Sequence, residues 1–429
     1  MIRLYDFDEV KPEEILNRDI RAEADVEATV DAIIADVRAR GDAALIEYAA
    51  KFDHAELQSV QVTQQEIDEA FAELDAQDPE FITTLKMAAE NIRHFHEQQL
   101  HKNFVLTDKP GVVLGQKYTP IQRAGVYVPG GTAAYPSTVL MDVIPAKVAG
   151  VKQIVMTTPA GPGGKVNPSI LAAAVIAGID LIFKTGGAQA VAALAYGTES
   201  VPAVDKIVGP GNIYVATAKR KVFGKVGIDM IAGPSEILVL ADGSCNPAWV
   251  AADLLSQAEH DKLATPVLVT DSWKLAKAVQ AELEVQIPQL PRAAIARASV
   301  DTNGKIIVTD DMNKAIEAVN IIAPEHLEIC VDDPFAVLNR VENAGSIFLG
   351  KNVPEALGDY FAGPNHTLPT SGTARFSSPL GVDDFVKKSS FLYYTREALG
   401  EVQQRIANFA EHEGLHAHAK SVTIRFEDQ

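Results

Sequence analysis

This sequence has few cysteines, no long apolar run and no excess of basic residues. Its 429 residues include two cysteines, Cys245 and Cys330, which excludes a disulfide framework and fits a reducing cytoplasm. No apolar run reaches the roughly 20 residues that a membrane-spanning helix needs, so we expect no membrane partner. The formal net charge of -19 argues against a nucleic-acid or anionic-membrane surface. The first residues lack a basic segment followed by an apolar one, so we also expect no secretory signal.

The remaining composition, with 47% hydrophobic and 22% charged residues, is ordinary for a globular protein. The length predicts two or three domains, and residues 1–111 are expected to form a mostly helical segment. Thr63 and Glu66 have the spacing of a capping box, and a second amphipathic helix is predicted after the next Asp-Pro pair. His94 and His96 would lie on different faces of that helix, so we expect both to be exposed and not to share a metal.

Short apolar strands, glycine turns and helices alternate from residue 112 onward, which predicts parallel sheets covered by helices on both faces. The pattern restarts after residue 235. The predicted fold is therefore α/β, with two incomplete, Rossmann-like doubly wound lobes at 112–235 and 236–380, a helical N-terminal segment and a helical C-terminal arm. Ligands of such folds bind beyond the carboxyl ends of the strands. The predicted strands are 112–114, 117–119, 125–128, 154–157, 181–183, 206–208, 237–240, 267–269, 305–308, 327–331 and 346–349.

The C-terminal arm, residues 381–429, is predicted to be helical from about residue 396. It ends in a segment rich in histidine that also contains Glu413. This segment is either a mobile polar terminus or an arm that docks on the site of its own or a neighbouring subunit. Three of the ten histidines of the chain lie within seven residues there: His412, His416 and His418.

Glycine-rich loops follow three predicted strands, at residues 129–131, 186–188 and 209–212. Glycine lets the backbone approach a ligand closely, and the free N–H groups of a following helix attract phosphate. None of the loops has the G-x-G-x-x-G spacing. In the last loop, Tyr214 stands where the third glycine would be. The loops therefore indicate either a dinucleotide site or ordinary tight turns.

Two polar pairs are candidates for chemistry. Gln257 and His260 project from one side of a predicted helix that starts at Asn246-Pro247, so they are either a divalent-metal pair or a solvated helix end. Glu325 and His326 stand between a predicted helix and a strand. A histidine there can accept a proton near neutral pH, and the glutamate can activate a water, although a polar loop is the plainer alternative.

A long predicted loop, 352–373, is rich in proline and aromatic residues and is expected to be ordered and functional. Within it, Asp359 is a candidate hard metal ligand and His366 a candidate supporting group. Cys330 could form a thiohemiacetal with an aldehyde, but it lies in a predicted strand, so we expect a buried structural cysteine. Cys245 has no evident base nearby.

Seven motifs together resemble the histidinol dehydrogenase family over essentially the whole chain. Each would be modest evidence alone, but their shared order is specific. They include Gly125-Val-Tyr-Val-Pro-Gly-Gly, Gly209-Pro-Gly-Asn and Ala323-Pro-Glu-His-Leu-Glu. The other four are residues 187–198, 232–236, 253–261 and 352–373.

The resemblance implies an NAD-dependent, two-step oxidation of L-histidinol to L-histidine through an aldehyde, the last step of histidine biosynthesis. Lobe 112–235 would bind NAD, and lobe 236–380 would bind metal and substrate. The protein would be a homodimer whose partner subunit contributes Glu413 and His418. The implied zinc ligands are Gln257, His260, Asp359 and His418. The implied substrate contacts are Ser235, Gln257, His260, His326, Asp359, Glu413 and His418. The implied cofactor contacts are Tyr127, Gln189 and Asn212.

In the implied chemistry, His326 removes the hydroxyl proton and Glu325 activates the water that adds to the aldehyde. Zinc positions the substrate, and no cysteine is needed. Two other classes fit the raw residues. One is a zinc hydrolase in which Glu325 activates a metal-bound water. The other is a two-lobed protein that binds a small ligand without chemistry.

Overall fold

The computed structural model of the chain describes residues 1–11, 15, 24–130 and 134–427. Gly131, the last residue of the first predicted glycine loop, lies outside them. The chain divides into two compact units, Met1–Gln99 with Ile121–Phe385 and Leu100–Pro120 with Val386–Gln429. Since compactness alone defines these units, the limits drawn from the sequence at residues 111, 235 and 380 stay predictions. Among the described residues, no helix is long and apolar enough to cross a bilayer.

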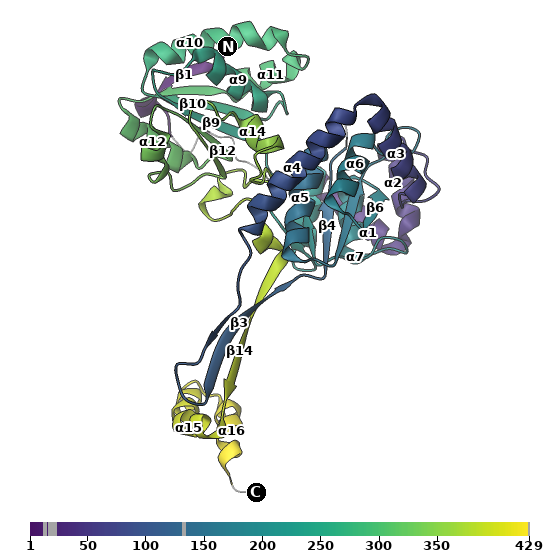
Figure 1. Cartoon of the computed structure of the whole chain (residues 1–429), viewed down its shortest axis with the longest axis vertical. Helices are drawn as coiled ribbons and strands as arrows, with labels where there is room; N and C mark the ends of the chain where they lie inside the picture. Colours follow the sequence, from purple (N-terminus) through teal and green to yellow (C-terminus); the bar gives the residue numbers. More distant parts are fainter. Residues whose placement is uncertain (12–14, 16–23, 131–133, 428–429) are drawn as a thin grey trace. The chain divides into compact units, whose positions relative to one another are not determined.

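The first unit contains two parallel sheets (Figure 1). The first sheet has the order β6-β5-β4-β7-β8, and each neighbouring pair is parallel. Taken in chain order this is 3-2-1-4-5, the start of the doubly wound arrangement, whose order reverses between β4 and β7. Its strands are β4 (Arg123–Tyr127), β5 (Gln153–Thr158), β6 (Leu181–Lys184), β7 (Lys206–Val208) and β8 (Gly227–Ile228).

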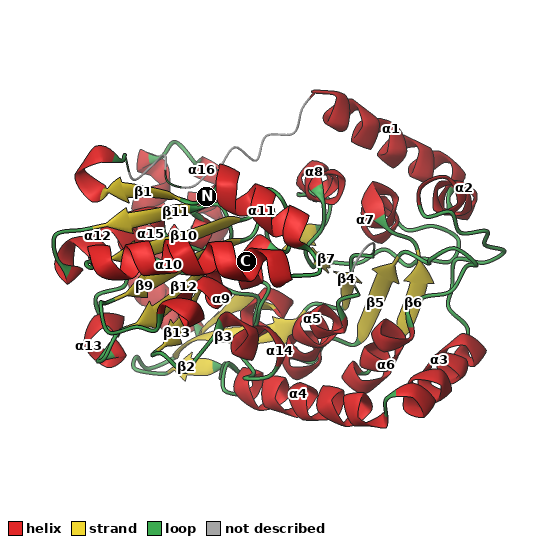
Figure 2. Cartoon of the chain, turned by 90° about the horizontal axis from the view of Figure 1, so that it is seen from above, coloured by secondary structure: helices red, strands yellow, loops and turns green. Residues whose placement is uncertain are grey.

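Helices cover both faces of the first sheet. Figure 2 shows α7 and α8 on one side of β4, β5 and β6, with α5 and α6 on the other, and each side has its own apolar core. These helices are α5 (Pro136–Ala149), α6 (Pro168–Ala177), α7 (Gly187–Tyr196) and α8 (Ile213–Val222). The prediction of a doubly wound lobe is confirmed.

Four N-terminal helices add to this lobe: α1 (Ala24–Arg40), α2 (Asp42–Phe52), α3 (Gln64–Gln77) and α4 (Pro79–Glu97). Residues of α1 and α2 join one core, and residues of α3 and α4 join the other. The predicted capping box is present, since Thr63 accepts from the Glu66 backbone and Glu66 accepts from the Thr63 backbone. The prediction that His96 is exposed was wrong. Its ring is buried with Nδ1 2.7 Å from the Ile92 carbonyl oxygen.

The second sheet has the order β1-β11-β10-β9-β12-β13, also fully parallel. Its edge strand β1 comes from the N-terminal segment, where a strand was not predicted. The strands are β1 (Arg3–Asp6), β9 (Glu236–Ala241), β10 (Thr265–Thr270), β11 (Lys305–Val308), β12 (His326–Cys330) and β13 (Ser346–Leu349). The helices are α9 (Pro247–Ala258), α10 (Trp273–Gln286), α11 (Ala293–Thr302), α12 (Met312–Ile322), α13 (Pro334–Leu338) and α14 (Glu355–Tyr360).

The predicted loop 352–373 is therefore interrupted by α14, and the prediction that it lacks regular structure was wrong. Six residues are too few to give an apolar repeat, so the sequence carried no periodic signal for this helix. The last turn of α14 holds Asp359, and its first residue is Glu355.

The second unit is a three-stranded antiparallel sheet, β14-β3-β2, with two helices. Residues 112–120 form one long strand instead of the two short ones predicted. The strand β14 was missed within the predicted arm. The elements are β2 (Phe104–Leu106), β3 (Val112–Pro120), β14 (Val386–Tyr394), α15 (Arg396–His412) and α16 (His416–Thr423).

Candidate active site

A cavity of about 470 Å³ in the first unit brings together residues from both parallel sheets. From the first sheet it receives the loops that follow β4 and β7, which are the carboxyl ends at the point where the strand order reverses. From the second sheet it receives the segments that precede β9 and β12. The cavity therefore lies at the carboxyl ends of the first sheet, where ligands were expected, but at the amino ends of strands of the second sheet. The lining includes Gly130, Asn212, Ser235, Gln257, His260, Glu325, His326, Asp359 and His366.

Helix α9 places Gln257 and His260 at this cavity. The helix starts where Asn246 accepts a hydrogen bond from the Ala248 backbone, as the Asn-Pro pair predicted. Gln257 is 1% exposed, and its Nε2 donates to Glu355 Oε1. Among the described residues, its Oε1 has no hydrogen-bond partner. The amide oxygen is therefore free to accept from, or coordinate, a ligand in the cavity.

His326 is the first residue of β12 and is buried among acidic groups. Its Nδ1 lies 3.0 Å from the Glu236 carbonyl oxygen, which sets that nitrogen as the N–H donor. Its Nε2 lies 3.6 Å from Asp359 Oδ1 and 3.8 Å from Glu355 Oε1, beyond hydrogen-bond distance. Burial disfavours the charged imidazole, but the charges of Glu355 and Glu325 outweigh this effect and raise the pKa of His326 above its ordinary value.

Glu325, also buried, has a fixed carboxylate. Its Oε2 accepts a 2.8 Å hydrogen bond from the Glu236 backbone N–H and lies 3.6 Å from His326 Nδ1. One residue of β9, Glu236, thus contacts both members of the predicted Glu-His pair. Its N–H donates to Glu325, and its carbonyl oxygen accepts from His326. This arrangement places a carboxylate and an imidazole side by side at the cavity, as acid–base chemistry requires.

Asp359 and His366 lie together, as the sequence suggested for residues 352–373. His366 Nδ1 is 3.0 Å from the Asp359 carbonyl oxygen, and its Nε2 is 3.2 Å from Thr138 Oγ1. His366 therefore ties the end of α14 to the first lobe. Burial opposes ionisation of Asp359, but the nearby imidazole of His326, 3.6 Å away, holds the pKa of the carboxyl below its ordinary value.

These donors fit a zinc ion. Burial lowers the pKa of His260, which favours the neutral imidazole that binds a metal. Asp359 offers a carboxylate oxygen, and Gln257 offers the buried amide oxygen that no described residue satisfies. Ligand atoms of His326, Glu355 and Asp359 lie within 4.8 Å of one another in the same region. The imidazole nitrogen of His260 and the carboxylate oxygen of Asp359 are ordinary zinc ligands.

The candidate cofactor residues lie around the glycine loops of the first lobe. Asn212 lines the cavity, and its Oδ1 caps α8 by accepting from the Tyr214 and Val215 backbones. Tyr127 and Gln189 are buried and do not line this cavity. The Tyr127 hydroxyl accepts a 3.2 Å hydrogen bond from the Gly187 backbone N–H, so it contacts the backbone of the second glycine loop.

The candidates Glu413 and His418 belong to the second unit. Glu413 follows the last residue of α15, and His418 lies in α16. Both side chains are exposed, so both are available to a ligand or another chain.

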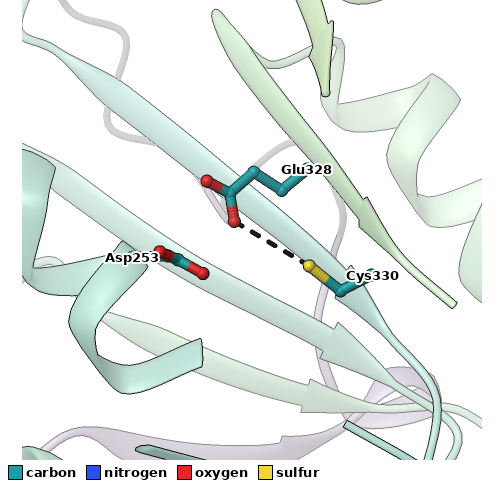
Figure 3. A group of neighbouring side chains, drawn as sticks. All are labelled: Asp253, Glu328 and Cys330. Atoms are coloured by element: carbon teal, nitrogen blue, oxygen red, sulfur yellow. Dashed lines mark hydrogen bonds between the residues drawn. The ribbon is translucent and has the colours of Figure 1, made fainter. Parts of the chain in front are cut away.

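Cys330 is confirmed as a buried cysteine of strand β12, and burial raises the pKa of its thiol. Its Sγ lies 3.9 Å from Glu328 Oε2 and points toward Asp253, as Figure 3 shows. It borders a different, smaller cavity of about 240 Å³. A protonated thiol in that place is poorly suited to covalent catalysis.

The order of the first sheet, its glycine loops and the acid–base pair across the cavity define an α/β enzyme of the dinucleotide-dependent class. The comparisons make the class specific. The sequence model of the family described as histidinol dehydrogenase matches residues 16–426. The chain belongs to the histidinol dehydrogenase family.

Curated relatives and a solved structure agree. The histidinol dehydrogenase of Geobacter sulfurreducens is 56% identical over 414 residues, covering 96% of each chain. That of Bacillus subtilis is 57% identical over 397 residues, covering 92% of each chain. The crystal structure of histidinol dehydrogenase from Elizabethkingia anophelis superposes with a TM-score of 0.93 at 39% identity, over 99% of this chain and 98% of that one.

The predicted family, fold class and enzyme class are confirmed. This chain is an NAD-dependent oxidoreductase of the final step of histidine biosynthesis, and its family uses NAD and zinc. The hydrolase and the binding protein are set aside. Sequence reasoning missed Glu355 and Glu236, which contact Gln257, Glu325 and His326. Both lie inside motifs that carry the family resemblance, 232–236 and 352–373, but neither was singled out as a site residue.

Proposed function

We propose that His326 is the base for both oxidations and that Glu325 activates the water added between them. Support comes from the geometry of the pair. Glu236 occupies His326 Nδ1 and leaves Nε2 as the proton-accepting atom. Glu325 is held beside the imidazole at 3.6 Å, close enough for the two groups to act on one bound carbon.

In the first oxidation, His326 Nε2 takes the hydroxyl proton of histidinol, and bound NAD would supply the hydride acceptor. In the hydration that follows, Glu325 takes a proton from water, the water oxygen bonds to the aldehyde carbon, and His326 returns its proton to the carbonyl oxygen. In the second oxidation, His326 removes a hydroxyl proton of the hydrate while bound NAD would accept the second hydride, which gives the carboxylic acid. The acid then ionises to the carboxylate, and three protons pass to solvent, from Glu325, from His326 and from the new carboxyl group.

We propose Gln257, His260, Asp359 and the partner subunit's His418 as the zinc ligands. Ser235, Gln257, His260, His326 and Asp359, with the partner subunit's Glu413, would contact the substrate. When bound, zinc supplies a fixed positive centre for the imidazole and amine of histidinol. The chain itself holds the donors in place, through α9 for Gln257 and His260 and through His366 for the end of α14.

For the cofactor, we propose Tyr127, Gln189 and Asn212. Support is their place at glycine loops that end parallel strands. Gly209, which opens the last loop, has a φ of +112°, and a Cβ there would lie 2.1 Å from the Tyr127 carbonyl oxygen. Only glycine allows this close approach between the ends of β4 and β7, where dinucleotides bind in such folds.

We also propose a homodimer with shared sites, acting in the cytoplasm. The second unit supports the dimer, because its buried side chains are mainly alanines, with Ala407, Ala410 and Ala419 forming a small cluster. Large apolar side chains remain exposed on it, including Phe391, Leu392 and Phe409. Such a surface favours association. Two buried free cysteines fit a reducing compartment.

The separate roles of Glu325 and His326 can be tested by half-reactions. Glu325→Gln should slow oxidation of the hydrated aldehyde far more than oxidation of histidinol, whereas His326→Asn should slow both, each by roughly 10²- to 10⁴-fold. Exposed Glu317 supplies the matched control Glu317→Gln, which should leave both rates unchanged. Equal losses in both half-reactions for Glu325→Gln would contradict its assignment to the water step.

The shared site can be tested with two inactive variants, His260→Ala and His418→Ala. A hybrid dimer of the two would contain one site with both changes and one intact site, so mixing should restore activity. Mixing His260→Ala with His326→Asn should not, because each site of that hybrid carries one change. No recovery in the first mixture, with hybrids verified by mass, would mean that each chain supplies its own histidine.

A further inference from the structure

The side-chain amide of Gln257 has two ends of nearly equal size and opposite chemistry. Only the oxygen can coordinate a metal, because the NH₂ group is a donor without a free lone pair. A buried glutamine ligand therefore needs a partner that fixes which end faces the cavity. In this structure Oε1 is the end left without a partner among the described residues, and Nε2 is the end that is bound.

Glu355 is the acceptor for Nε2, which also lies 3.4 Å from His326 Nδ1. Its side chain is 2% exposed, Oε1 accepts from Gln257 Nε2, and Oε2 accepts a 3.0 Å hydrogen bond from Ser256 Oγ. Its backbone N–H donates at 2.7 Å to Glu328 Oε1, which anchors the first residue of α14. Burial raises the pKa of Glu355 to about 8. Its Oε1 is an acceptor both in the ionised carboxylate and in the acid that carries its proton on Oε2, so the opposite orientation of Gln257 would set oxygen against oxygen.

We infer that Glu355 is a positioning residue that holds the Gln257 amide with Oε1 toward the cavity. Glu355 belongs to a group whose ligand atoms lie within 4.8 Å of one another. Because its Oε1 accepts from Gln257 and its Oε2 accepts from Ser256, we assign the carboxylate to Gln257 rather than to the metal. This inference rests on the proposed role of Gln257 as a zinc ligand. Residues that orient a metal ligand in this way typically change metal affinity by roughly 10- to 100-fold when they are replaced.

The test compares two substitutions by titrating the metal-free protein with Zn²⁺ alone against a chromophoric chelator. Glu355→Met keeps the volume and removes both acceptors, so the zinc dissociation constant should rise roughly 10- to 100-fold. Glu355→Gln removes the charge but keeps an oxygen for Nε2 and an NH₂ for Ser256. Its zinc dissociation constant should stay within about fivefold of wild type, as for one weakened hydrogen bond.

NAD⁺ affinity, measured by protein fluorescence on the same samples, separates positioning from general damage. It should be unchanged in Glu355→Met. Unchanged zinc affinity in a folded Glu355→Met protein would overturn the inference, and so would an equal loss of zinc and NAD⁺ affinity. If Glu355→Gln weakened zinc as much as Glu355→Met, the lost charge would be the cause, and the orientation argument would fail.

Repeating the zinc titration in a Gln257→Glu variant makes the test specific to the orientation of the Gln257 amide. In Gln257→Glu both outer atoms are oxygens, so Glu355→Met should not weaken zinc further there. An additional loss in that background would overturn the inference. Failure of the proposed function gives a different result, because Gln257→Ala would then leave zinc affinity unchanged. Weaker zinc in Gln257→Ala, together with normal zinc in Glu355→Met, would reject the positioning role alone.

Discussion

Replacing Lys219 by methionine should destabilise the first lobe and loosen the loop that opens at Gly209. Lys219 and Asp229 form an ion pair whose side chains are 2% and 1% exposed. Lys219 Nζ also donates to the Gly209 carbonyl oxygen at 2.9 Å, and the Gly209 N–H donates to Asp229 Oδ2 at 2.8 Å. The ion pair therefore forms hydrogen bonds with both the carbonyl oxygen and the N–H of Gly209, the glycine that begins the proposed cofactor loop.

The magnitude follows from what remains after the substitution. Lys219→Met leaves a buried Asp229 carboxylate, and breaking such a pair typically costs about 3–5 kcal/mol. Asp229 keeps the backbone donors of Gly209 and Met230, so we expect the lower end, about 3 kcal/mol. At roughly 2–4 °C per kcal/mol, the unfolding midpoint should fall by roughly 6–12 °C.

Far-UV circular dichroism is the suitable assay, because Trp249 and Trp273 both lie in helices of the second lobe. Lys147→Met is the matched control, since its pair with Asp180 is partly exposed and worth at most about 1 kcal/mol. Adding Asp229→Asn to Lys219→Met should recover stability, because no buried charge remains. A midpoint for Lys219→Met within about 1 °C of wild type would refute the reasoning.

Two further predictions concern buried groups outside the proposed chemistry. Burial raises the pKa of Asp142 to about 8, so the folded protein holds a proton that the unfolded chain, with a pKa of about 3.9, has lost. Stability present below that lower pKa is lost as pH rises toward 8, by up to about 1.4 kcal/mol per pH unit. In urea unfolding at pH 5 to 8, Asp142→Asn should abolish this decline in the free energy of unfolding. Equal pH dependence of that free energy in wild type and variant would contradict the prediction. Cys330→Ser should keep kcat within about twofold in NADH assays, since a buried, protonated thiol is a poor nucleophile. A loss of orders of magnitude would revive the covalent route.

Elements with strong local signals were predictable from the sequence. Helix α9 was predicted to start at Asn246-Pro247, and it does start there, because an asparagine followed by proline is typical of a helix N-terminus. The strand β13 was predicted at its observed bounds, 346–349. In the first unit, local patterns in the sequence predicted most strands of the two parallel sheets.

Features set by distant parts of the chain were not predictable. Strand β14 pairs with β3 across about 270 residues, and most of it is exposed, so no apolar alternation marks it. Glu355 gains its role by meeting Gln257, 98 residues away. The sequence placed Glu325 and His326 at the start of a strand. The packing that brings the amino ends of β9 and β12 to a cavity shared with the first sheet depends on distant contacts, which no motif records.

The most direct test of the account is the number of NADH molecules formed per histidinol consumed, followed at 340 nm before and after chelation. The account predicts two NADH per histidinol, loss of turnover on chelation and its return with Zn²⁺. One NADH per histidinol would mean that the aldehyde escapes before hydration, which contradicts the role given to Glu325. Two NADH that persist after complete removal of metal would contradict the zinc site at Gln257, His260 and Asp359.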